Sequence, residues 1–141
     1  MDVKVKIQSK IENLDGAGLP LGDIERSDDT FLGRYEYADG SATLWYEERG
    51  ESGEVRSEIS VSDGVVTVKR SGAIESIFVF KPGEEYDTLY SVPPYKFDVR
   101  LKPRKIGAEL GSEGGQVDLL YNMSIGGADK AVRMKIWIRT D

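Results

Sequence analysis

The chain has 141 residues, which suits one domain with its own apolar core, and its formal net charge is -6. Nucleic acids and anionic membranes attract basic surfaces, so we expect this acidic chain to bind neither. Cysteine and histidine are absent, which removes disulfides, thiol nucleophiles, the usual general base and the commonest transition-metal ligand. The first six residues alternate instead of presenting a basic cap and an apolar run, so we expect no secretion signal. No run of about 18 apolar residues is present that could span a membrane. We therefore expect a soluble, cytoplasmic protein that is not an enzyme and has no cofactor or metal.

The N-terminal region divides into a strand and a long acidic connection. Residues 2–11 are predicted to form a strand, because Val3, Val5 and Ile7 alternate with polar side chains. Residues 12–29 are rich in acidic residues and glycine, so we expect a long loop that acts as a lid or is mobile. The carboxylates of this loop lack the regular spacing of an EF-hand, so calcium binding is not expected there.

Two Asp-Gly dipeptides predict tight hairpins in the central region. Asp39-Gly40 and Asp63-Gly64 each lie between alternating segments, as two-residue hairpin turns do. Each turn fixes the register of the strands that it joins and brings apolar residues together on one face. The expected pairs on the apolar faces are Gly33 with Tyr46, Tyr35 with Leu44, Tyr37 with Ala42, Ile59 with Val68, and Val61 with Val66.

The strands that follow contain two local irregularities. A turn at Ser71-Gly72 leads into a strand at residues 73–81, and a two-residue turn there would direct Glu75 inward. Further along, the apolar phase slips by one residue at residues 102–104. Pro103 has no amide hydrogen to give to a neighbouring strand, so we expect a bulge at this point.

The C-terminal hairpin, residues 116–140, contains the two longest alternations in the sequence. A two-residue turn at Gly127-Ala128, with glycine first as a type II′ turn requires, would place Val117 opposite Ile138. A turn at Gly126-Gly127 is the alternative, and it keeps the same side chains together on each face. One face of this hairpin is expected to meet the core and the other to meet water.

These elements predict an all-β fold in a single domain over residues 1–141. About 8–10 strands follow one another as antiparallel neighbours, and no segment has a helical period long enough to predict a helix. An open sheet of this length would expose an edge and a whole apolar face, so we expect the up-and-down meander to close into a barrel. Barrels of this size have room for side chains alone or for one small ligand.

Four short motifs carry a resemblance to a known family. They are Gly33-x-Tyr35, Leu44-x-Tyr46-x-Glu48, Phe80-x-Pro82-Gly83, and Tyr90 followed by Pro94-Tyr95. With these motifs in this order, the chain resembles the YwiB-like family of small bacterial proteins of unassigned function. The resemblance extends nearly end to end, and it implies a calycin-type, lipocalin-like β-barrel that holds a small apolar or amphipathic ligand. It provides no catalytic residue.

The candidate ligand contacts are tyrosines, their apolar neighbours and two glutamates. Tyrosine rings give contact area with a hydroxyl handle, and a buried glutamate would anchor a polar group of the ligand. The alternative is that the rings fill the core and that the glutamates lie at exposed strand ends. The candidates, at the barrel interior or its mouth, are Gly33, Tyr35, Leu44, Tyr46, Glu48, Glu75, Tyr90, Tyr95 and Phe97.

A second hypothesis is a structural or protein-interaction domain whose barrel interior is filled. Trp45, Phe78 and Trp137 would then be exposed aromatic anchors, or the protein would form a homodimer through that face. The basic side chains within residues 100–105 are expected to form a solvated strand face. No spacing of Asp, Glu, Tyr or Lys indicates a catalytic constellation, so an enzyme is the third and least supported class.

Overall fold

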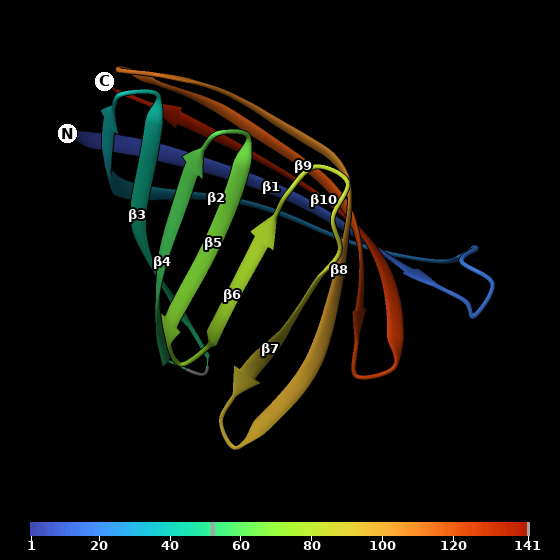
Figure 1. Ribbon diagram of the computed structural model, residues 1–141. Coiled ribbons are helices and arrows are strands. Elements are labelled where there is room, and N and C mark those ends of the chain that lie inside the picture. Colours follow the sequence, from blue (N-terminus) through green and yellow to red (C-terminus); the bar gives the residue numbers. More distant parts are fainter. Residues whose placement is uncertain (52, 141) are drawn as a thin grey trace.

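The computed structural model describes residues 1–51 and 53–140, and these residues form ten β-strands and no helix. Each strand pairs antiparallel with its neighbours in sequence, and β1 also pairs with β10, so the sheet closes into a barrel (Figure 1). The predicted all-β, up-and-down barrel is therefore confirmed. This part of the chain contains no helix that could cross a membrane. The strands are β1 (Asp2–Leu14), β2 (Pro20–Ala38), β3 (Ser41–Gly50), β4 (Gly53–Ser62), β5 (Val65–Gly72), β6 (Glu75–Phe80), β7 (Tyr86–Val92), β8 (Tyr95–Gly111), β9 (Gly114–Ile125) and β10 (Ala128–Arg139).

The two Asp-Gly hairpins form as predicted. Asp39-Gly40 joins β2 to β3, and Asp63-Gly64 joins β4 to β5, each as a two-residue turn. The residues of both turns have positive φ, from 53° to 78°, which glycine adopts freely and aspartate tolerates better than most residues. The predicted pairs across these turns are all present, including Tyr35 with Leu44.

The C-terminal hairpin adopts the second of the two predicted turns. Ile125 pairs with Ala128, so Gly126-Gly127 forms the turn and Val117 lies opposite Ile136. The prediction of a turn at Gly127-Ala128 was therefore wrong. Both glycines have positive φ, 56° and 82°, which is the requirement of a type I′ turn and which alanine would not meet without strain.

The phase slip in β8 is a bulge, as predicted. Pro103 lies opposite Tyr121 and Lys105 lies opposite Leu120, so one residue of β8 is left between them. This extra residue shifts the inward phase of β8 by one position. Val99 and Leu101 face the core before the bulge, and Ile106 and Leu110 pack against the core after it.

The prediction of a long acidic loop at residues 12–29 was wrong. Strand β1 continues to Leu14, β2 begins at Pro20, and the two pair as a ribbon that extends beyond the barrel wall (Figure 1). The Asp15 carboxylate caps the turn by accepting hydrogen bonds from the amides of Ala17 and Leu19. Residues 20–30 are exposed throughout, so neither face of this part of β2 needs apolar side chains. The alternation by which a strand is recognised in a sequence is therefore absent here.

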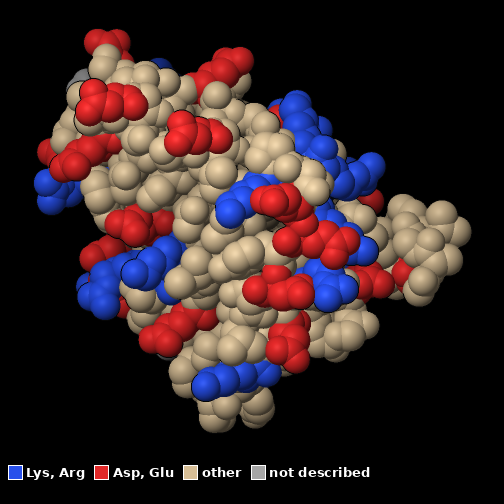
Figure 2. All heavy atoms as spheres, viewed as in Figure 1, with Lys and Arg blue, Asp and Glu red and all other residues tan. Residues whose placement is uncertain are grey.

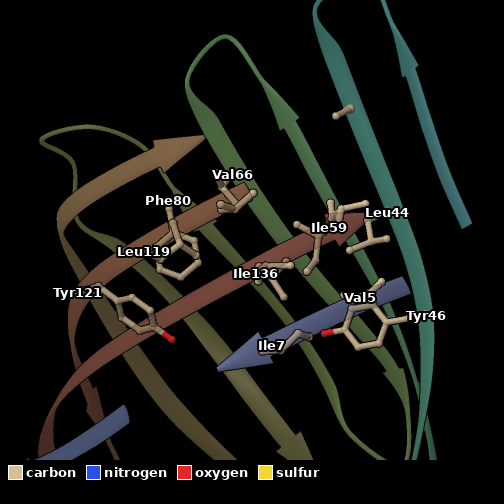
Figure 3. Packing of buried hydrophobic residues seen from close by; sticks show 14 of the residues in the cluster. Val5, Ile7, Leu44, Tyr46, Ile59, Val66, Phe80, Leu119, Tyr121 and Ile136 are labelled. Atoms are coloured by element: carbon tan, nitrogen blue, oxygen red, sulfur yellow. The ribbon is translucent and has the colours of Figure 1, made fainter. Parts of the chain in front are cut away.

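The middle of the barrel is a packed apolar core to which the strands contribute alternate residues (Figure 3). Tyr35 is buried there with its hydroxyl satisfied, because it donates a hydrogen bond to the carbonyl oxygen of Gly111 at 2.7 Å. The largest fully buried side chains are Tyr35, Phe80, Leu44, Leu101, Leu119 and Ile136.

One seam in the barrel wall is short. Backbone pairing between β6 and β7 is confined to Glu75 with Ser91 and Ser76 with Tyr90. The aromatic ring of Tyr90 also approaches the ring of Phe78 across this seam, with the ring centroids 6.3 Å apart. The wall is therefore completed at this seam largely by side chains.

Gly33 provides a test of the close packing of the wall. A β-carbon added to Gly33 would lie 2.6 Å from the carbonyl oxygen of Trp45, whereas one added to Gly107 would meet nothing nearer than 3.7 Å. We expect Gly33→Ala to lower the free energy of unfolding by about 1–3 kcal/mol, because the backbone must shift to admit the methyl group. Urea denaturation followed by tryptophan fluorescence measures this. Gly107→Ala is the matched strand control, and equal losses in both variants would contradict the packing argument.

A candidate ligand cavity in the barrel

A cavity of about 330 Å³ opens at the end of the barrel where β1 ends and β10 begins. Its volume lies within the range of small-molecule sites, and its wall is mostly apolar with a few polar groups, as in such sites. The side chains around it are Ser9, Ile11, Val68, Arg70, Ser76, Phe78, Phe80, Tyr90, Tyr121, Met123, Ile125, Lys130, Val132 and Met134.

The floor of the cavity is formed by an aromatic pair. The rings of Phe80 and Tyr121 are tilted against each other with centroids 4.7 Å apart, and both side chains are buried. Figure 3 shows Tyr121 and Tyr46 on opposite sides of the core, each hydroxyl pointing into the interior. Burial raises the pKa of Tyr121 to about 12, although the positive charge of Arg70 acts in the opposite direction.

Arg70 projects into this interior because it continues the inward phase of Val66 and Val68 on β5. It lies opposite Ser57 on β4 and opposite Ser76 on β6, and both of these serines are buried. We call Ser57, Arg70 and Ser76 the polar row. The Nε atom of Arg70 is buried and has no hydrogen-bond partner among the described residues.

The guanidinium of Arg70 influences a second phenol as well. Burial raises the pKa of Tyr46, and the positive charge of Arg70, together with hydrogen bonding to Ser57 and Arg70, partly offsets that increase. The negative charge of Glu48 acts in the same direction as burial. Tyr46 lies opposite Ser57 in the register of β3 with β4, so the polar row continues toward Tyr46. A positive charge thus lies within reach of two buried phenols.

Lys130 is the second cation of the cavity. It faces inward in phase with Val132 and Met134, and its Nζ donates a hydrogen bond to Oδ1 of Asn13 at 2.9 Å. The cavity lining contains no aspartate or glutamate. A protein with a formal net charge of -6 therefore has two cations and no carboxylate around this cavity.

The acidic groups lie mostly on the outside, where Figure 2 shows them interspersed with basic side chains. Arg100 on the outer face pairs with Asp87 at 2.8 Å, and this hydrogen bond lowers the pKa of the aspartate. The basic run that includes Arg100 and Lys102 is exposed, as expected for a solvated strand face. The described residues bring together no group of three or more acidic side chains that could hold a metal ion.

Of the candidate contacts, Tyr90 lines the cavity. Tyr35, Leu44 and Tyr46 are buried in the core, where the alternative interpretation placed them. Gly33 is part of the wall, where its missing side chain lets β2 approach β3 closely.

The remaining candidates lie away from the cavity. Glu48 is half-buried near Tyr46, whereas Tyr95 and Phe97 are 65% and 37% exposed in β8 beside the turn from β7. The prediction that Glu75 points inward was wrong, because Glu75 is exposed and pairs with Ser91. The last residues of β5 and β6 that pair are Arg70 and Ser76, so residues 71–75 separate the paired parts of the two strands, and the phase of β6 differs from the phase that a two-residue turn would give.

The same change of phase affects the predicted aromatic anchors. Phe78 lines the cavity, so its assignment as an exposed anchor was wrong. Trp45 and Trp137 face outward but are half-buried. The Trp45 ring nitrogen donates a hydrogen bond to Glu58, and Trp137 lies under the ammonium group of Lys6 at 5.6 Å.

Several cavity residues were missed as candidates, including both cations. Arg70 and Lys130 each stand at an inward position of an otherwise apolar strand face. A charged residue at such a position is unusual, and this signal could have identified them from the sequence.

The sequence matches the family model of a domain of unknown function, DUF1934, over residues 5–136. The chain belongs to the DUF1934 family. It is 28% identical over 94 residues to the uncharacterized β-barrel protein YwiB of Bacillus subtilis (strain 168), a match that covers 67% of this chain and 66% of that protein. The crystal structure of the ywiB protein from Bacillus subtilis has the same fold, with a TM-score of 0.81 at 23% identity over 99% of this chain and 93% of the other. The predicted family resemblance is confirmed.

The raised pKa of Tyr121 makes stability depend on pH in a defined direction. Between about pH 10 and about pH 12 the phenol ionises in the unfolded chain but remains protonated in the folded protein. The folded state then binds more protons, so the free energy of unfolding decreases as pH rises through this interval. We compare how far the free energy of unfolding decreases between about pH 9 and about pH 11. For Tyr121→Phe we expect this decrease to be smaller than for the unchanged protein by about 1 kcal/mol. Urea denaturation at both pH values measures this, and equal losses would contradict the assignment.

Proposed function

We propose that this protein is a non-catalytic binding module for a small amphipathic molecule, which occupies the cavity at the open end of the barrel. The observation that carries the proposal is the cavity itself, which remains beside a fully packed core. A closed barrel with a filled interior would support a purely structural role instead.

The chemistry of the lining supports binding over catalysis. Aliphatic, aromatic and thioether side chains dominate it, and methionines such as Met123 and Met134 adapt to ligands of different shape. The titratable groups of the lining are two cations and two phenols, without a carboxylate, and the sequence contains no histidine or cysteine. This set suits holding a ligand better than transferring protons at neutral pH.

A second candidate function is interaction with a protein, including a second copy of this chain. A groove of about 730 Å³ outside the barrel is bordered by Leu32, Trp45 and Arg56, and Leu32 is 79% exposed. Exposed apolar groups also occur on the β1–β2 ribbon, where Leu19 and Leu21 are 62% and 59% exposed. Sedimentation equilibrium would detect self-association and is independent of whether the cavity binds a ligand.

Filling the cavity tests the proposal. We expect the unchanged protein to bind the uncharged fluorescent amphiphile N-phenylnaphthylamine in a one-to-one complex with enhanced, blue-shifted emission. Met134→Trp should weaken this binding at least about tenfold, because the larger ring takes up space that the ligand needs.

Lys135→Trp is the matched control, since the side chain of this neighbour on β10 lies outside the cavity. It should bind the probe as the unchanged protein does. Absence of saturable binding by the unchanged protein, or equal binding by both tryptophan variants, would contradict the proposed site.

A further inference from the structure

We infer that the ligand of this cavity carries an anionic head group, a carboxylate or a phosphate, and that Arg70 binds it. The inference rests on the proposed function and specifies the chemical class of the ligand. The apolar part of the molecule would lie against Met123, Ile125 and Met134. The occupant is therefore an anionic amphiphile.

Arg70 has a buried hydrogen-bond donor that is not satisfied. Its Nε is buried without a hydrogen-bond partner among the described residues, and a buried donor in this state is destabilising. A guanidinium group presents its N–H donors as a planar fork that matches the oxygens of a carboxylate or phosphate. An anion at Arg70 would satisfy the donor and neutralise the charge together.

No aspartate or glutamate lines the cavity beside its two cations. No described acidic side chain forms an ion pair with Arg70 or Lys130, and the Lys130 ammonium group donates to the neutral amide of Asn13. Arg100, on the outer surface, pairs with Asp87. Arg70 and Lys130 are both half-buried, and a cation that is partly withdrawn from water is stabilised by an opposite charge, so two unneutralised cations beside one cavity favour an anion from outside.

Two serine hydroxyls lie beside Arg70 on the neighbouring strands. Ser57 and Ser76 flank Arg70 on the adjacent strands and are only 3% and 7% exposed. Serine hydroxyls can donate to an anionic oxygen. Ser76 lines the cavity and is thus the neighbour placed to share the head group with Arg70.

The test compares three ligands that share one alkyl chain: decanoate, decyl phosphate and the uncharged decanol. Isothermal titration calorimetry of the unchanged protein should show decanoate or decyl phosphate binding about 10- to 100-fold more tightly than decanol, which is the contribution of a charge-assisted hydrogen bond. The preferred anion identifies whether the head group is a carboxylate or a phosphate. Arg70→Gln should remove the preference and retain decanol binding.

Lys69→Gln is the control of equal charge change, because Lys69 precedes Arg70 on β5 and lies opposite Glu58 outside the barrel. It should keep the full preference. If decanol binds the unchanged protein as tightly as both anions, the head-group inference is overturned while the proposed function stands. If none of the three binds, the proposed function itself fails. The ligand comparison on the unchanged protein gives this decision even if Arg70→Gln does not fold.

Discussion

Strand β1 holds the barrel closed by pairing with β2 along one edge and with β10 along the other. This double pairing joins the two ends of a ten-strand meander and removes the exposed edges that an open sheet would have. It also fixes the size of the interior, because the circumference of a barrel grows with the number of its strands. Ten strands enclose more space than their side chains fill here, and the remaining space is the cavity.

The interior therefore has two regions with different chemistry. In the middle, large apolar side chains such as Phe80, Leu119 and Ile136 pack into a core that stabilises the fold. At the open end, methionines and aromatic rings surround a cavity that also receives Arg70 and Lys130. These two cations, with no carboxylate in the lining, are the basis of our proposal that the ligand is an anion.

Much of the fold could be predicted because local chemistry and hydrophobic pattern agree over most strands. The Asp39-Gly40 turn fixed the register of β2 with β3, and Pro103 marked the bulge. The strand character of residues 20–29 could not be predicted, since this part of β2 is exposed on both faces and has no apolar alternation. The orientation of Glu75 depended on the length of a turn, which the dipeptide Ser71-Gly72 does not determine.

The site was less predictable than the fold, since tyrosines are equally suited to a core and to a cavity. Tyr35 and Tyr46 fill the core, whereas Tyr90 lines the cavity, and the sequence does not distinguish these environments. The informative residues were Arg70 and Lys130, charged groups at inward positions of apolar strand faces. That they line one cavity follows only from the closed arrangement of β5 and β10.

The most direct test of the proposed site is a crystal structure of the protein grown with a saturating concentration of decanoate or decyl phosphate, whichever binds more tightly. We expect the anionic head group within hydrogen-bonding distance of Arg70 Nε and the alkyl chain between Met123 and Met134. An empty cavity, or a ligand bound with its head group directed away from Arg70, would contradict the proposal.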